Sequence, residues 1–145
     1  MPLPTPEPGL VIRYAYLWES EHKEGRDEGI KDRPCAVILV TEDGDDGKTV
    51  TVLPITHTPP ADEKLALEIP APTKKRLGLD EGRSWIVLTE ANRFIWPGPD
   101  LRPTVKGDLD SVAYGALPEA FFIAMRNKFV AILKAKQAKL VSRTE

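Results

Sequence analysis

The sequence predicts a mainly β fold, a small half-open β-barrel that carries an amphipathic helix at its C-terminal end. Two patterns lead to this prediction. Short runs rich in β-branched and aromatic residues, separated by turn-forming sequences, occupy the first two thirds of the chain. After Leu117, apolar residues recur instead at spacings of three and four, which is the helical period. With 145 residues, we expect a single domain that spans residues 1–145.

Five segments are predicted as strands. They are Leu10–Trp18, Arg33–Thr41, Thr49–Ile55, Ala66–Pro70 at a sheet edge, and Arg83–Phe94. Four prolines in residues 1–8 predict an extended lead-in, and "EDGDDGK" is a turn that should join the second and third strands as a hairpin. The charged stretch "ESEHKEGRDEGIKD" between the first two strands predicts a long loop, and loops of this length are often functional or mobile.

Two helical segments are expected. "PTKKRLGL" predicts one or two helical turns that end at Gly78, and Pro118-Glu119 should begin a closing helix over residues 118–140. The apolar face of the closing helix comprises Phe122, Met125, Phe129, Ile132 and Leu133. Its opposite face carries Arg126, Lys128, Lys134, Lys136 and Lys139. That basic face is either a solvated surface or a contact for an acidic partner segment.

Composition excludes several classes of protein. The net charge of −2 argues against a general nucleic-acid coat protein, although a local basic groove stays possible. The longest aliphatic run, Ala36–Val40, is too short to cross a bilayer, and the first residues lack the pattern of a secretion signal. Cys35 is the single cysteine, so neither an internal disulfide nor a cysteine zinc cluster can form. We therefore expect a cytoplasmic protein with no membrane contact, no metal and no cofactor.

The stretch "VLPITHTPP" ends a predicted buried strand in polar residues. Thr56, His57 and Thr58 follow the apolar run, and a Pro-Pro turn follows them. A plain turn would explain this pattern, because threonine and proline are ordinary strand terminators. The predicted hairpin, however, would place Arg33 and Thr56 at the same open end. A guanidinium and a hydroxyl would then lie close together, as a phosphate-binding site requires.

"KDRPCAVILV" followed by "TVTVLPITHTPP" resembles the MazF/PemK family of toxin endoribonucleases from bacterial toxin–antitoxin systems. The order of the later segments "LEIP", "RLGLDEGRSWIVLTEANRF" and "LPEAFFIAMRNKFVAIL" is also similar to that family, so the resemblance covers roughly Gly9–Leu133. It implies an SH3-like small β-barrel that forms a homodimer. It further implies cleavage of single-stranded RNA such as mRNA without a metal, under control of a cognate antitoxin protein.

The resemblance assigns roles to individual residues. Arg33 matches the family's catalytic arginine and Thr56 its catalytic threonine. The other residues expected to contact RNA are Glu21, His22, His57, Thr58, Glu90, Asn92 and Arg93. The sequence also departs from the family: an acidic residue is missing after Gly9, and the loop before Arg33 is longer. The expected last arginine falls on Asn92 or Arg93, and that choice of one residue decides which sheet face it occupies.

The chemistry of RNA cleavage fits these residue types. With the substrate's 2′-hydroxyl as nucleophile, Arg33 would stabilise charge on the phosphate oxygens, and Pro34 would hold its backbone extended. Thr56 does not ionise near neutrality, so its role would be to donate a hydrogen bond. His57, His22 and Glu90 are each either acid–base groups or ordinary hydrogen-bonded surface residues. Trp96 is either a base-stacking platform or a core residue.

Two functions remain open at this level. The first is a metal-independent endoribonuclease of a type II toxin–antitoxin system. The second is a non-catalytic SH3-like binding module, a degenerate toxin relative that binds RNA, a protein partner or DNA gyrase. A plain structural domain, in which Arg33 forms a surface salt bridge away from Thr56, is the third possibility.

Overall fold

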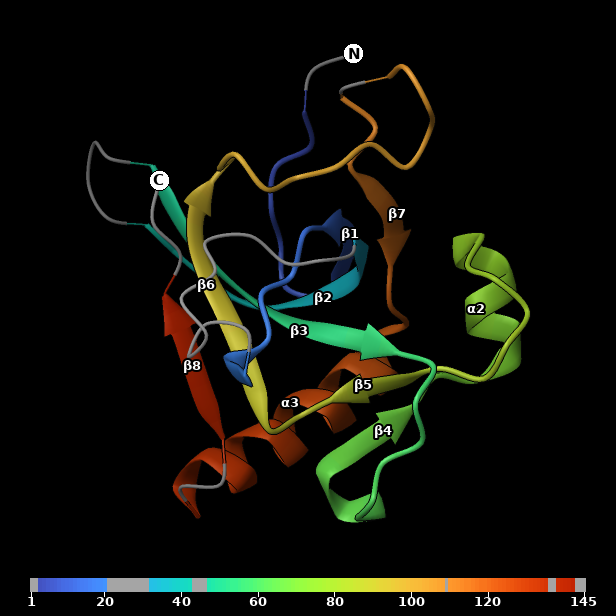
Figure 1. Cartoon of the computed structure of the whole chain (residues 1–145), viewed down its shortest axis with the longest axis vertical. Coiled ribbons are helices and arrows are strands. Elements are labelled where there is room, and N and C mark those ends of the chain that lie inside the picture. The colour runs from blue at the N-terminus through green and yellow to red at the C-terminus, as the bar shows by residue number, and fades with distance from the viewer. Residues whose placement is uncertain (1–2, 21–31, 43–46, 109, 136–137, 143–145) are drawn as a thin grey trace.

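The computed structural model describes residues 3–20, 32–42, 47–108, 110–135 and 138–142 (Figure 1). Within these ranges, eight strands form one sheet, accompanied by two α-helices and a 3₁₀ turn. The strands are β1 Leu10–Tyr14, β2 Arg33–Glu42, β3 Lys48–Thr56, β4 Ala66–Glu68, β5 Trp85–Val87, β6 Glu90–Trp96, β7 Ala113–Ala116 and β8 Lys139–Ser142. The helices are α2 Ala71–Leu77 and α3 Glu119–Lys134, and the 3₁₀ turn is η2 Glu63–Leu65. The mainly β class with a C-terminal helix is thus confirmed.

The sheet is organised around β3. Its neighbours run in the order β4-β5-β3-β2-β1-β7, all antiparallel, while β6 also pairs with β3 and β8 adds in parallel to β6. The first half of β3 pairs with β6 and its last two residues pair with β5, so the sheet branches along this strand. Among the described residues the pairing does not close into a barrel. The predicted strands therefore form a sheet, but strand pairing does not close this sheet into the expected barrel.

The predicted hairpin is present. β2 pairs with β3 from Cys35 opposite Pro54 to Glu42 opposite Lys48, with one irregularity in register between Val37 and Leu39. Because side chains alternate along a strand, each strand contributes to two cores. Ala36 and Leu53 belong to one core, on which the buried face of α3 packs, while Cys35 and Val52 belong to the other. β2 is thus covered on both faces from Cys35 to Ile38, as its aliphatic sequence predicted, whereas the next residue, Leu39, is 52% exposed.

Two shorter predictions are also confirmed. "ALEIP" contains the end strand β4, and "PTKKRLGL" contains α2. Gly78 adopts a left-handed conformation with φ 72° and donates its backbone N–H to carbonyls of the last turn of α2. A glycine suits this position because the left-handed conformation costs it nothing.

Three boundaries differ from the prediction. Arg83–Phe94 is not one strand, since β5 ends at Val87 and β6 begins at Glu90 as the chain moves from one end of β3 to the other. The strand predicted over Leu10–Trp18 ends at Tyr14. The closing helix ends at Lys134 rather than residue 140, because Lys139–Ser142 pairs with β6 as β8. The prediction also missed β7.

No helix in the described part of the chain has both the length and the apolar character that a membrane span requires.

Candidate functional site

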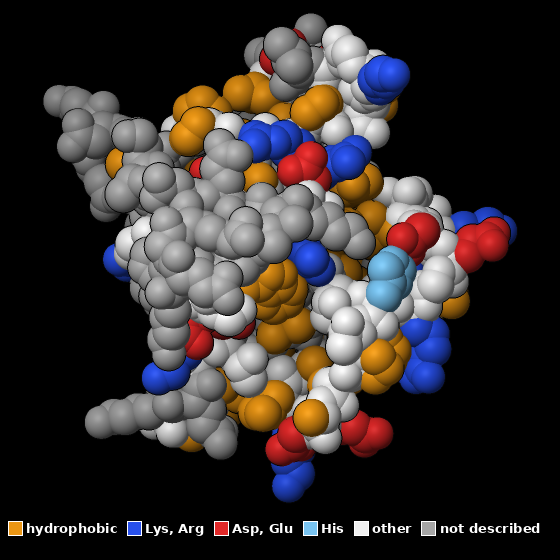
Figure 2. Space-filling model, viewed as in Figure 1, with side chains coloured by type: hydrophobic (Ala, Val, Ile, Leu, Met, Phe, Trp, Pro, Cys, Tyr) orange, Lys and Arg blue, Asp and Glu red, His pale blue; other side chains and the backbone are white. Residues whose placement is uncertain are grey.

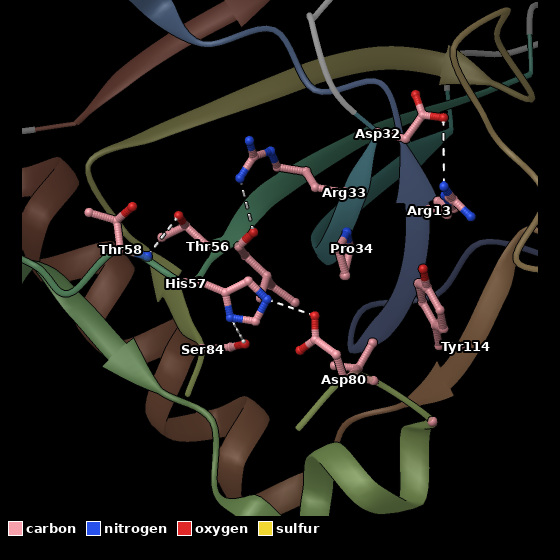
Figure 3. Close-up of a pocket in the computed structure, with 13 residues that line it drawn as sticks. Arg13, Asp32, Arg33, Pro34, Thr56, His57, Thr58, Asp80, Ser84 and Tyr114 are labelled. Atoms are coloured by element: carbon pink, nitrogen blue, oxygen red, sulfur yellow. Dashed lines mark hydrogen bonds and ion pairs between the residues drawn. The ribbon is translucent and has the colours of Figure 1, made fainter. Parts of the chain in front are cut away.

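A cavity of about 450 Å³ lies at the open end of the β2–β3 hairpin (Figure 3). Arg33 is the first residue of β2 and Thr56 the last of β3, and the antiparallel register brings these two strand ends together. Both residues line the cavity, as do His57 and Thr58 just beyond β3. Four of the residues predicted from the sequence therefore share one cavity.

Arg33 is half-buried on the wall of this cavity and is only lightly held. Its Nη1 donates to the carbonyl of Ile55 at 3.4 Å, and the guanidinium carbon lies 4.9 Å from the centre of the Trp18 ring. Its Nε is buried and has no hydrogen-bond partner within the described ranges. A buried donor without a partner is costly, and an anion that turned the guanidinium could satisfy it.

The other charges around Arg33 pair with one another. Asp32 lies 4.0 Å from Arg13 and 3.5 Å from Arg102, measured between the closest nitrogen and oxygen atoms. Within the ranges that the structure describes, no carboxylate forms a salt bridge with Arg33. Among the described residues, the guanidinium of Arg33 therefore has no partner that neutralises its charge, even though the whole chain has a net charge of −2.

Thr56 and Thr58 form a small turn where β3 ends. The Thr56 hydroxyl accepts a hydrogen bond from the backbone N–H of Thr58 at 3.2 Å. A hydroxyl that accepts in this way still has its own proton to donate. Thr56 can therefore offer a hydrogen bond to a ligand in the cavity, which is the role expected of it.

His57 is held by contacts at both ring nitrogens. Nδ1 lies 2.8 Å from the carbonyl oxygen of Arg83 and 3.3 Å from the Ser84 hydroxyl, and Nε2 lies 2.7 Å from Asp80. A carbonyl can only accept, so Nδ1 must carry a proton to make its contact. A substrate that used His57 as a base would have to displace Asp80 from Nε2. The ring is thus fixed in place, and Figure 3 shows it beside Asp80 and Ser84.

Lys74 donates hydrogen bonds to three residues of the segment Asp80–Ser84, which also contacts His57. This α2 residue is only 5% exposed, and its Nζ donates to Asp80 at 3.0 Å, to Ser84 at 2.7 Å and to the carbonyl of Gly82. Burial tends to raise the pKa of Asp80, but hydrogen bonds from Lys74 and His57 outweigh it, and the pKa is lowered. Asp80 is therefore ionised at neutral pH and joins a buried ammonium to the histidine.

The remaining predicted contacts are not brought to this cavity. Glu90 accepts hydrogen bonds from the Tyr16 hydroxyl at 3.1 Å and from the backbone N–H of Glu19 at 2.9 Å. Asn92 is fully buried, and Arg93 is exposed and donates to Ser142 at 3.0 Å. RNA contacts by these three residues stay predictions. Glu21 and His22 lie outside the described residues.

Asn92 has an evident structural task. Its amide oxygen accepts from the Leu17 N–H and its amide nitrogen donates to the Leu17 carbonyl, both at 2.8 Å. Leu17 lies beyond the end of β1, and the Asn92 side chain makes with its backbone the two hydrogen bonds that a neighbouring strand would make inside the sheet. Asn92 and Arg93 were the two candidates for the position of the family's last arginine. The buried position of the two is Asn92, and Arg93 is exposed.

A second cavity of about 460 Å³ adjoins the first, because Thr56 and Thr58 line both. Trp18, Pro59 and Pro60 also line it. Figure 2 shows the molecule from the side of Figure 1, and hydrophobic side chains reach the surface near its centre with basic side chains beside them. For Trp96 the sequence left open a stacking platform or a core residue, and the side chain packs against the core that contains Phe94.

The sequence reasoning missed several residues of this region, namely Arg13, Trp18, Lys74, Asp80, Ser84 and Tyr114. The helix-ending Gly78 was the one local signal near Asp80, and it predicted a turn but not a contact with His57. The chain matches no protein-family model, and no curated protein matches it either.

Proposed function

We propose that this chain binds single-stranded RNA at the Arg33–Thr56 cavity and cleaves it without a metal. The observation that carries the proposal is the shared cavity itself. A guanidinium with no carboxylate partner among the described residues and a hydroxyl able to donate line the same hollow. Planar guanidinium groups suit phosphate because they can donate two parallel hydrogen bonds.

In the proposed reaction the substrate supplies the nucleophile. The 2′-oxygen forms a bond to the adjacent phosphorus, the bond from phosphorus to the 5′-oxygen breaks, and the products are a 2′,3′-cyclic phosphate and a 5′-hydroxyl. Solvent water would take the proton from the 2′-hydroxyl and return one to the 5′-oxygen, so that no proton is consumed overall. Arg33 would stabilise the charge that grows on the equatorial oxygens, and Thr56 would donate to one of them. Donors placed where charge develops lower the barrier more than they stabilise the substrate.

A second candidate is RNA binding without cleavage, and the contacts of His57 and Glu90 favour it. Both side chains already have hydrogen-bond partners, so neither is poised to exchange a proton with a substrate. This is the state expected of a degenerate toxin relative. The alternative ligands of such a module, a protein partner or DNA gyrase, have no comparable support in the cavity.

The broader biological setting follows from the resemblance to the MazF/PemK toxins. We propose an SH3-like fold that is left open rather than closed, a homodimer, and a cytoplasmic role in a type II toxin–antitoxin system. An acidic antitoxin segment would compete with RNA because Arg33 offers the same charge to a carboxylate as to a phosphate.

The test is incubation of the purified protein with single-stranded RNA in EDTA, together with a Kd measured on RNA whose 2′-hydroxyls are methylated. We expect fragments that end in a 2′,3′-cyclic phosphate, and a rate about 100-fold lower for Arg33→Ala. Arg126→Ala is the matched control, because Arg126 is an exposed arginine on α3 that does not line the cavity.

The outcomes separate the two candidates. Binding that depends on Arg33 without any fragments would replace the nuclease with the binding module. If RNA neither binds nor is cleaved, or if Arg33→Ala behaves as the wild type in both assays, the proposal is wrong.

A further inference from the structure

We propose that the cavity beside Trp18 is a nucleobase pocket, which receives the unpaired base of a nucleotide whose phosphate lies at Arg33. The inference rests on the proposed binding of single-stranded RNA and adds the part of the ligand that the Arg33 cavity does not contact. Its basis is that the two cavities share a wall made by Thr56 and Thr58. One ligand can therefore occupy both.

The walls of this pocket differ from those of the Arg33 cavity. Trp18, Pro59, Pro60 and Val87 give it a largely apolar lining, while the two shared threonines place hydroxyls at its boundary. A nucleobase has the matching surface, with apolar faces and a polar edge that can hydrogen-bond. The pocket beside Trp18 has a volume of about 460 Å³, which lies in the range of small-molecule sites.

Trp18 is held in a way that suits a stacking platform. It is half-buried, and its ring meets Tyr16 edge-on at 5.1 Å between centroids and 70° between planes. Tyr16 is fully buried and donates from its hydroxyl to Glu90. The tryptophan is thus fixed from the core side, so little side-chain entropy is lost when a base packs on the part of the ring that lines the cavity.

Arg33 connects the two halves of the proposed site. Its guanidinium carbon lies 4.9 Å from the centre of the Trp18 ring, and the same side chain lines the phosphate cavity. A cation and an aromatic ring in contact match the alternation of phosphate and base along a single strand. An apolar peptide would use the pocket but leave the charge of Arg33 unmatched, so the geometry points to a nucleotide.

The experiment uses a short RNA of about eight nucleotides with every 2′-hydroxyl methylated, which binds but cannot be cleaved by 2′-attack. One base at a time is removed to leave an abasic sugar, and Kd is measured for wild type, Trp18→Ala and Trp18→Phe. We expect one abasic position to weaken wild-type binding about 10-fold, the usual range for loss of one stacked base. In Trp18→Ala that abasic penalty should vanish, whereas Trp18→Phe should keep most of it.

Controls distinguish this inference from the proposed function. Trp96→Phe should leave the abasic profile unchanged, because Trp96 does not line either cavity, and thermal unfolding checks that each variant folds. Coupling between Trp18 and one base without any RNA cleavage would support the pocket and refute the nuclease. Cleavage with no abasic position coupled to Trp18 would overturn the pocket and leave the nuclease intact. A Trp18 fluorescence change caused by an acidic peptide but not by the RNA would also overturn it.

Discussion

Replacing Lys74 with methionine should destabilise the protein and loosen the segment that holds His57. Methionine keeps the length and the helix propensity of lysine but removes the ammonium group. Three acceptors then lose their donor: the Asp80 carboxylate, the Ser84 hydroxyl and the Gly82 carbonyl.

The expected magnitude follows from the burial of each acceptor. The Asp80 side chain is 64% exposed, so water replaces the ammonium there and that contact contributes little. Ser84 is only 2% exposed, and a buried acceptor that loses its partner costs about 1–3 kcal/mol. Gly82 is exposed, so water replaces the ammonium at its carbonyl as well, and Ser84 keeps its contact with His57. Removing a buried charge offsets a further part of the cost. We expect a net loss of about 1–2 kcal/mol, or a fall in Tm of roughly 3–8 °C at this chain length.

The assay is urea unfolding followed by circular dichroism, at pH 7, with Lys75→Met as the matched control. Lys75 is the next residue of α2 and is exposed, so its replacement should change the free energy of unfolding by less than about 0.5 kcal/mol. If Lys74→Met and Lys75→Met have the same stability, the hydrogen bonds of Lys74 do not stabilise the Asp80–Ser84 segment.

Three further predictions concern pH, the buried amide and a glycine. Asp80→Asn should lower Tm at pH 7, because a carboxylate with a lowered pKa stabilises the fold while it is ionised. The difference from wild type should begin to shrink as pH falls below about 4, the pKa of an aspartate in the unfolded chain, and should be lost as pH passes the lowered pKa of the folded state. A difference that does not shrink at all between pH 7 and pH 3 would contradict this. Asn92→Ala should cost about 3 kcal/mol in urea unfolding, since it leaves the buried N–H and C=O of Leu17 unpaired; a loss under 1 kcal/mol would argue against that role. Gly115→Ala should cost about 1–3 kcal/mol by the same assay, because Gly115 has φ 143° and an added Cβ would lie 3.0 Å from the Leu77 side chain. Unchanged stability would show that alanine fits this position without backbone strain.

The sequence by itself determined the features that depend on local patterns. Alternation and turn residues predicted the β2–β3 hairpin, Gly78 predicted the end of α2, and the three-and-four spacing predicted α3. The meeting of Arg33 and Thr56 at one cavity followed from the same hairpin, because a hairpin brings its two outer ends together.

Only the tertiary structure decided which side chains are already engaged. Asp80 is 23 positions from His57, and Leu17 is 75 positions from Asn92, so no local period relates either pair. The division of Arg83–Phe94 into β5 and β6 and the addition of β8 likewise depend on how distant strands share β3 and β6. Contacts between segments far apart in sequence arise from packing, and the packing that fixed His57 and placed Trp18 beside Arg33 leaves no repeating pattern along the chain.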